Sequence, residues 1–214
     1  MRIHFSANVI LLMKQFELTF KPSVLHNTKR IVITNELISY NELEEKNTQP
    51  VLITSTNLSG IRYGIKWIKG YKFYIGRIYC IDILRTDNEV LKLRLKSVYR
   101  IRLHKLNDKY HQILTALYDF FFNDLIEKHL GLFLSNQPFE LGGVRFTPEG
   151  IVLVKHGLII WDDVALKQYS HYFSIFSKKE SHKNAFFEFS VDWNSPILFT
   201  VIGKILTLSE QQRL

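Results

Sequence analysis

Two segments of the chain place apolar, β-branched residues on either side of a turn sequence, as β-hairpins do. Residues 29–40, KRIVITNELISY, form two such runs around Thr34, Asn35 and Glu36, and asparagine favours a tight turn. Residues 144–154, VRFTPEGIVLV, form two runs around a Thr-Pro-Glu-Gly turn. We therefore predict an antiparallel hairpin in each segment.

The two hairpin sequences align with each other, and the alignment continues along the chain. Thr34 and Glu36 correspond to Thr147 and Glu149, and residues 55–63 then correspond to residues 161–169. The second alignment has a shorter offset because the first copy has a longer polar loop, Asn41 to Pro50. Self-similarity at two linked positions indicates a duplicated unit.

Each copy ends in a segment whose apolar residues recur at helical spacing. In the first, residues 107–130 follow a capping Asn107 or Asp108, and Gly131 supplies a stop signal. In the second, Ser195 and Pro196 begin a helix over residues 196–208. The stretches between hairpin and helix are rich in aromatic and β-branched residues, which predicts further strands.

These patterns predict a β-rich α+β protein with two tandem domains. The N-terminal domain is expected to span residues 1–131 and the C-terminal domain residues 139–214, with residues 132–138 as a short linker. Each domain consists of antiparallel strands closed by its own C-terminal helix.

A series of antiparallel strands followed by one helix, found twice, resembles the bacterial pleckstrin-homology-like (PH-like) superfold. The resemblance is strongest at Gly150 to Leu153 and at Leu158 to Val164, where Trp161 precedes two aspartates, followed by the helix at 196–208. The first copy has Thr56-Asn57 in place of the Trp-acid pair and an insertion around Trp67 to Cys80. The resemblance implies two tandem PH-like barrels or sandwiches of a kind used to bind phosphoinositides, peptides or other proteins.

Phosphoinositide-binding members of that superfold use a basic loop between strands 1 and 2. The corresponding loop here, Asn41 to Pro50, contains Glu42, Glu44 and Glu45 against a single Lys46. This loop would repel a phosphorylated headgroup.

No motif in the sequence is typical of catalysis, of a cofactor site or of a metal site. The eight histidines show no paired-ligand spacing, and the glycines form no phosphate-binding loop. Asp162 and Asp163 would point to opposite faces of a strand, so we assign them and Trp161 a structural role. We therefore expect a protein that is not an enzyme, with no cofactor, no metal and no small-molecule substrate.

The location suggested by the sequence is the cytoplasm. The apolar stretch Val9 to Met13 is short for a secretory signal, and no run of residues approaches the roughly 18 apolar residues of a membrane span. Cys80, the single cysteine, cannot form an internal disulfide and is expected to pack as a small apolar residue.

The positive charge of the chain is concentrated in its first half. The net charge is +8, and residues 137–214 contribute none of it because they hold 8 basic and 8 acidic residues. In VLKLRLKS, strand alternation places Lys92, Arg94 and Lys96 on one face, and Arg100 and Arg102 continue the row if the strand persists. Such a row can neutralise phosphates, and the nearby Trp67, Tyr71 and Tyr74 can stack on bases.

Two functions agree with these observations. The first is a non-catalytic binding or scaffolding protein that acts through protein–protein contacts, because such a protein needs only surfaces. The alternative is a polyanion binder, for an anionic membrane surface or nucleic acid, which uses Lys92, Arg94, Lys96, Arg100 and Arg102. The remaining interpretation is a solvated strand face with no ligand.

Overall fold

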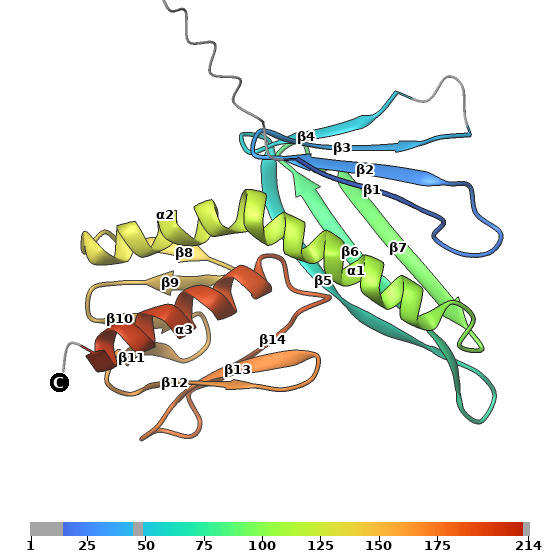
Figure 1. The fold of residues 1–214 in the computed structure, drawn as a ribbon. Helices are drawn as coiled ribbons and strands as arrows, with labels where there is room; N and C mark the ends of the chain where they lie inside the picture. The colour runs from blue at the N-terminus through green and yellow to red at the C-terminus, as the bar shows by residue number, and fades with distance from the viewer. Residues whose placement is uncertain (1–14, 45–48, 212–214) are drawn as a thin grey trace, which may run out of the picture.

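The computed structural model describes residues 15–44 and 49–211, and their strands form two pairs of antiparallel sheets (Figure 1). The first half contains a four-stranded sheet and a three-stranded sheet. The four-stranded sheet has the order β1 (Gln15–Phe20), β2 (Lys29–Thr34), β3 (Leu37–Glu42), β4 (Val51–Thr54). The three-stranded sheet has the order β5 (Leu58–Lys69), β6 (Tyr74–Arg85), β7 (Val90–Val98).

The second half repeats this order of elements with shorter strands. Its four-stranded sheet consists of β8 (Phe139–Leu141), β9 (Val144–Phe146), β10 (Gly150–Leu153) and β11 (Gly157–Ile160). Its three-stranded sheet consists of β12 (Val164–Gln168), β13 (Tyr172–Ser177) and β14 (Asn184–Glu188). A helix follows each set, so the predicted antiparallel architecture with a helix after the first half and at the C-terminus is confirmed. Over the described residues the strands form four separate sheets and not a closed barrel.

The two predicted hairpins are present and occupy equivalent places in the two halves. Ile33 pairs with Ile38 across the β2–β3 turn, and Ile151 pairs with Phe146 across the β9–β10 turn. The second aligned pair of segments leads into β5 in one half and into β12 in the other. The internal alignment therefore matched strands that have the same position in the order of strands of their half.

The first helix is longer than the predicted range, residues 107–130. It runs without a break through α1 (Leu103–Leu117), the π-helical turn η1 (Tyr118–Phe122) and α2 (Asn123–Leu134). Gly131 does not end it, because Leu130 is buried and Phe133 packs against Trp161 with ring centroids 5.2 Å apart. These contacts outweigh the roughly 1 kcal/mol by which glycine disfavours a helix. The expected linker at 132–138 thus begins inside the helix, and only residues 135–138 connect α2 to β8.

The π-helical turn separates two parts of the helix that pack in different regions of one continuous core. Leu106, Tyr110 and Ile113 of α1 are buried over the first half, where α1 packs on β1 and β7. Ile126 and Leu130 of α2 are buried where α2 packs on α3 (Ser195–Gln211), as Figure 1 shows. A π turn absorbs one extra residue in its wider winding.

The C-terminal helix α3 lies within one residue of its predicted start and extends to Gln211. Its apolar stripe is fully buried, including Ile197, Leu198, Val201, Ile202 and Ile205. It packs on β12 of its own half and also on α2 and β5, so it does not close only its own sheets.

The two halves are joined along the outer edge of β5. Tyr63 N–H donates to Phe189 O (2.9 Å), and Asn194 N–H donates to Ile61 O (2.7 Å). The Asn194 side chain accepts a hydrogen bond from Ile61 N–H at 3.0 Å. Beside them, the Arg62 guanidinium lies over the Trp193 ring, 4.1 Å from its centroid. Residues 189–194 of the second half therefore fix the position of β5. No helix among the described residues is long and apolar enough to cross a membrane.

Candidate anion-binding face

Strand β7 separates charged and apolar side chains onto two faces. Leu91, Leu93 and Leu95 are buried, whereas Lys92 and Lys96 are exposed and Arg94 is half-buried. The alternation predicted from the sequence is confirmed for these six residues. One side of the strand thus supplies the core under α1, and the other supplies cations.

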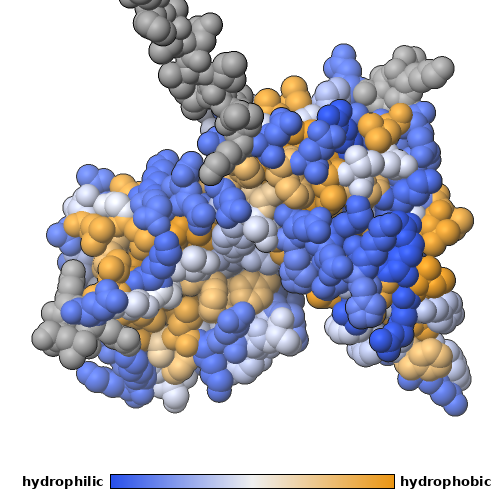
Figure 2. Space-filling view, viewed as in Figure 1, coloured by the Kyte–Doolittle hydropathy of each residue, from blue (hydrophilic) through white to orange (hydrophobic). Residues whose placement is uncertain are grey.

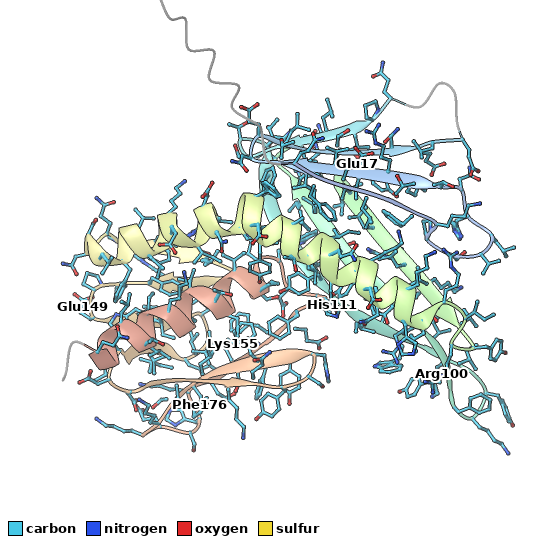
Figure 3. All side chains as sticks on the ribbon, viewed as in Figure 1. Glu17, Arg100, His111, Glu149, Lys155 and Phe176 are labelled. Carbon is cyan, nitrogen blue, oxygen red and sulfur yellow. The ribbon has the colours of Figure 1, made fainter. Side chains whose placement is uncertain are left out.

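The predicted continuation of the row to Arg100 and Arg102 is wrong, because the strand ends at Val98. Tyr99, Arg100 and Arg102 all have positive φ, between 50° and 62°. These left-handed residues turn the chain from β7 into α1, and Ser97 Oγ stabilises the turn by donating to Ile101 O at 3.0 Å. Arg100 is exposed at this turn, at the end of the sheet, as Figure 3 shows.

The strands beside β7 add cations that the alternation within β7 alone did not predict. In the antiparallel register, Arg62 of β5 and Lys92 of β7 flank Asp82 of β6, and Lys66 and Lys96 flank Ile78. Residues directly opposite each other share a face of the sheet. We define the basic face as the outer surface formed by Arg62, Lys66, Lys92, Arg94 and Lys96. In the sequence, Arg62, Gly64 and Lys66 alternate and so share one face of β5. That face could be identified as the basic face only from the structure, in which β5 and β7 both pair with β6.

Asp82 is the one acidic side chain that this register places on the basic face, and it is bound by both arginines. Its side chain is 4% exposed, with Oδ2 3.1 Å from Arg62 Nε and Oδ1 2.5 Å from Arg94 Nη2. Arg62 Nη1 also donates to Val191 O at 2.8 Å, and Arg94 Nη1 donates to Leu93 O at 2.9 Å. Both arginines are therefore engaged in contacts within the protein. They hold the strands of the sheet together, and Arg62 also contacts the second half.

The three lysines of the basic face remain available to a ligand. Lys66, Lys92 and Lys96 are exposed, and within the part of the chain that the structure describes none of them lies in an ion pair. Gly64 and Cys80 lie between them in the register opposite Arg94. The face therefore presents three ammonium groups around a centre that Ser190 of the second half covers at Gly64.

Cys80 occupies this centre as a packed side chain, as expected from the sequence. It is buried, with Sγ 3.6 Å from Ile78 O. Burial raises the pKa of its thiol, while the positive charges of Arg94 and Lys66 act against that rise. A buried thiol with a raised pKa is a poor nucleophile.

The predicted stacking aromatics, Trp67, Tyr71 and Tyr74, lie at one end of the basic face. The β5–β6 hairpin extends beyond the rest of its sheet, and all three side chains are exposed there. The Trp67 and Tyr74 rings have centroids 5.7 Å apart, and the Arg77 guanidinium lies 4.7 Å from the Trp67 ring centroid. This extended hairpin is the insertion around Trp67 to Cys80 that the second copy lacks.

The acidic pair next to Trp161 has a structural role. Trp161 Nε1 donates to Thr147 O at 3.1 Å, and its ring packs on Phe133 and Phe146. Asp163 accepts from Ser177 Oγ and from Lys179 N–H (2.8 Å), which ties two turns together. The Ser177 hydrogen bond lowers the pKa of Asp163, since it favours the ionised carboxylate.

A pocket of about 610 Å³ lies where the two halves meet, between the start of β5, α2 and the β8–β9 turn. Its ionisable residues are Asp124, Lys128, His129 and Glu140. His129 Nδ1 is engaged with Leu125 O at 2.7 Å, which fixes the ring against α2. Among the described residues, no three His, Cys, Asp or Glu side chains are grouped so that they could hold a metal ion.

No protein-family model matches this sequence, and no curated protein matches it.

Proposed function

We propose that this chain is a non-catalytic binding protein whose basic face binds the phosphate groups of a polyanion. The observation behind the proposal is the set of exposed lysines, Lys66, Lys92 and Lys96, on a rigid sheet whose one acidic side chain is already bound by two arginines. Among the residues that β5, β6 and β7 place on that face, no carboxylate besides Asp82 competes for their ammonium groups. This is the arrangement that favours binding of negative charge.

The spacing of the lysines indicates the kind of anion. Lys66 and Lys96 are two strands apart, roughly 10 Å, and Lys92 and Lys96 are four residues apart, about 13 Å along the strand. These are separations between backbones, and lysine side chains are long and flexible, so two of them can still reach one phosphate. A molecule or surface that displays several phosphates matches all three cations at once.

We also propose that each half is a PH-like unit. The support is the order of four strands, three strands and a helix, which occurs twice with the aligned segments in equivalent positions. The two units would differ in role, since the second has no extended hairpin and no net charge over residues 137–214.

Binding to heparin, a soluble polyanion without bases or lipid, tests the proposal. The variant Lys66→Glu, Lys92→Glu, Lys96→Glu should bind at least tenfold more weakly than the parent at low salt, because six charge units change at the contact surface. The matched control is Lys128→Glu, Lys155→Glu, Lys167→Glu, which makes the same charge change at exposed lysines away from the basic face. If both triple variants lose affinity equally, binding reflects net charge and the basic face is not the site.

The second candidate is a protein–protein scaffold, which was the first expectation from the sequence. The observation that favours it is the pocket of about 610 Å³ between the two halves, which both apolar and polar groups line. A parent protein that does not bind heparin even at low salt would contradict the basic-face proposal and leave this candidate in its place.

A further inference from the structure

Large apolar side chains gather at one end of the first half and are exposed there. The β5–β6 hairpin contributes Trp67, Tyr71, Phe73 and Tyr74, with Tyr71 93% exposed. The β7–α1 turn adds Tyr99 and Ile101, and the β1–β2 loop adds Val24 and Leu25, with Leu25 94% exposed. We define these eight residues as the apolar end. Figure 2 shows orange side chains projecting between blue ones where these loops lie.

The three segments of the apolar end are held together by hydrogen bonds and shared pockets. Tyr99 N–H donates to Ile75 O (2.7 Å), which fixes the β7–α1 turn beside β6. Lys96 N–H donates to Pro22 O (2.8 Å), which fixes the β1–β2 loop beside β7. Val24, Leu25 and Ile101 then line one shallow pocket of about 240 Å³. Phe73, Tyr74 and Tyr99 line a second pocket, and Tyr99 and Ile101 belong to one turn, so the three segments adjoin.

The charges around the apolar end are almost all positive. The sequence contains no Asp or Glu between residues 46 and 81, nor between residues 90 and 107. Lys69, Lys72 and Arg100 are exposed among the apolar groups, and Lys66 and Lys96 of the basic face adjoin them. The nearby Glu44 is engaged by Thr28, whose N–H and Oγ donate to its Oε1 at 3.2 and 3.0 Å.

We infer that this end of the molecule docks on an anionic lipid bilayer, with the apolar end in the headgroup region and the basic face against the lipid phosphates. The inference rests on the proposed function and names the source of the phosphates. Monomeric proteins rarely expose a continuous apolar region without a partner for it. Tryptophan and tyrosine favour the interface of a bilayer, where the ring is in apolar surroundings and its polar atom in water.

A bilayer fits these residues better than a nucleic acid does. Bases stack on aromatic rings, and they would leave the aliphatic Val24, Leu25 and Ile101 in water. Acyl chains and the glycerol region cover aliphatic and aromatic groups alike. The surrounding cations match a surface of anionic lipids.

Sedimentation with vesicles tests the inference, using phosphatidylcholine alone and phosphatidylcholine with a third phosphatidylglycerol. We expect the parent to bind only the anionic vesicles. The variant Tyr71→Ser, Phe73→Ser should bind them at least tenfold more weakly and yet bind heparin within twofold of the parent. The matched control Val154→Ser, Phe186→Ser removes two exposed apolar side chains from the second half and should bind vesicles as the parent does.

The fluorescence of Trp67 gives a second readout, because Trp161 and Trp193 are only partly exposed and lie in the other half. Lipids brominated near the headgroup should quench the parent, and the added quenching should disappear in Trp67→Phe. Vesicle binding that Tyr71→Ser, Phe73→Ser leaves unchanged would overturn the role of the apolar end.

The outcomes also separate the inference from the proposed function. A parent that binds heparin and not anionic vesicles overturns the bilayer inference and leaves the basic face as a polyanion site. Binding to a single-stranded oligonucleotide that Tyr71→Ser, Phe73→Ser weakens, without vesicle binding, would assign the apolar end to nucleic acid instead. A parent that binds none of the three overturns both.

Discussion

At the scale of single residues, Asp82 determines how the basic face is built. Its carboxylate lies between two guanidiniums that are only partly exposed, and each of its oxygens contacts one of them. Without it, Arg62 and Arg94 would repel each other beside the joint. Because Asp82 binds Arg62 and Arg94, these two cations hold the sheet together. The lysines of the basic face are the cations left for an external anion.

The substitution Asp82→Asn should therefore destabilise the protein. Removing one partner from a buried ion pair leaves unpaired charge, and we expect a loss of about 3 kcal/mol in the free energy of unfolding, measured in urea. Asp87→Asn breaks an ion pair with Arg85 in which the aspartate is 48% exposed, and should cost no more than about 1 kcal/mol. Equal losses for the two variants would contradict the structural role of Asp82.

Asn194 has a comparable role at the joint. Its φ is 61°, and its side chain accepts from Ile61 N–H and donates to Ser59 O at 3.3 Å. Asn194→Gly keeps the left-handed backbone accessible and removes both hydrogen bonds, so we expect a loss of roughly 1–3 kcal/mol in thermal or urea unfolding. Asn136→Gly, at an exposed residue with φ 54°, should leave stability unchanged or slightly raised.

The hydrogen bonds of Asp163 predict how stability responds to acid. They hold its folded pKa below the value in the unfolded chain, so the unfolded state takes up a proton first as the pH falls. The contribution of Asp163 is therefore complete above about pH 4 and is lost as the pH falls through the folded pKa. An NMR titration should give a pKa below the usual range for Asp163, and Ser177→Ala should raise it. An unshifted pKa in the parent would contradict the Ser177 contact.

At the scale of elements, the long first helix shows what the sequence pattern does and does not predict. The spacing of Tyr110, Ile113 and Leu117 identified a helix because an apolar stripe at that spacing can be buried only in a helix. The same pattern assumes a constant 3.6 residues per turn, so it does not reveal the π turn at Tyr118–Phe122. The C-terminal end of the helix was also mispredicted, because Gly131 is held helical by Phe133 and Trp161, a contact between segments far apart in the sequence.

Deleting Asp119 tests the purpose of the π turn. The wider winding of the turn absorbs one residue, so the deletion converts η1 to regular α-helix and leaves Ile126 and Leu130 facing the core. We expect the free energy of unfolding, measured in urea, to fall by less than about 3 kcal/mol, the loss seen when large aliphatic groups leave a core. Asp119→Ala at the same exposed position should change it by about 0.5 kcal/mol at most. A larger loss in the deletion variant would show that the packing of α2 depends on the extra residue.

At the scale of the whole molecule, the duplication could be predicted from the sequence, whereas the contact between β5 and residues 189–194 could not. The repeat was recognisable because each copy uses the same turn chemistry at Thr34 and Thr147, where the hydroxyl accepts from a backbone N–H three residues later. The joint depends on β5 pairing with residues 189–194, more than 120 residues away, and no local pattern encodes that contact. The basic face was predicted only in its β7 part for the same reason, since Lys66 joins it through strand pairing.

The two halves differ in net charge and in their exposed apolar residues. The first half contains the excess positive charge, the extended β5–β6 hairpin and the apolar end, while the second half contributes residues 189–194 that position β5. We therefore expect the second half to support the binding surface of the first.

The salt dependence of heparin affinity, compared between the parent and Lys66→Glu, Lys92→Glu, Lys96→Glu, tests whether the basic face binds the polyanion. Each cation in contact with the polyanion should add about one unit to the slope of log affinity against log salt, by analogy with about 0.9 per phosphate on duplex DNA. We predict that the triple variant has a slope smaller by about three units and that Lys128→Glu, Lys155→Glu, Lys167→Glu retains the parent slope. A parent affinity that does not change with salt, or a slope that the basic-face variant retains, would show that these lysines do not bind the polyanion.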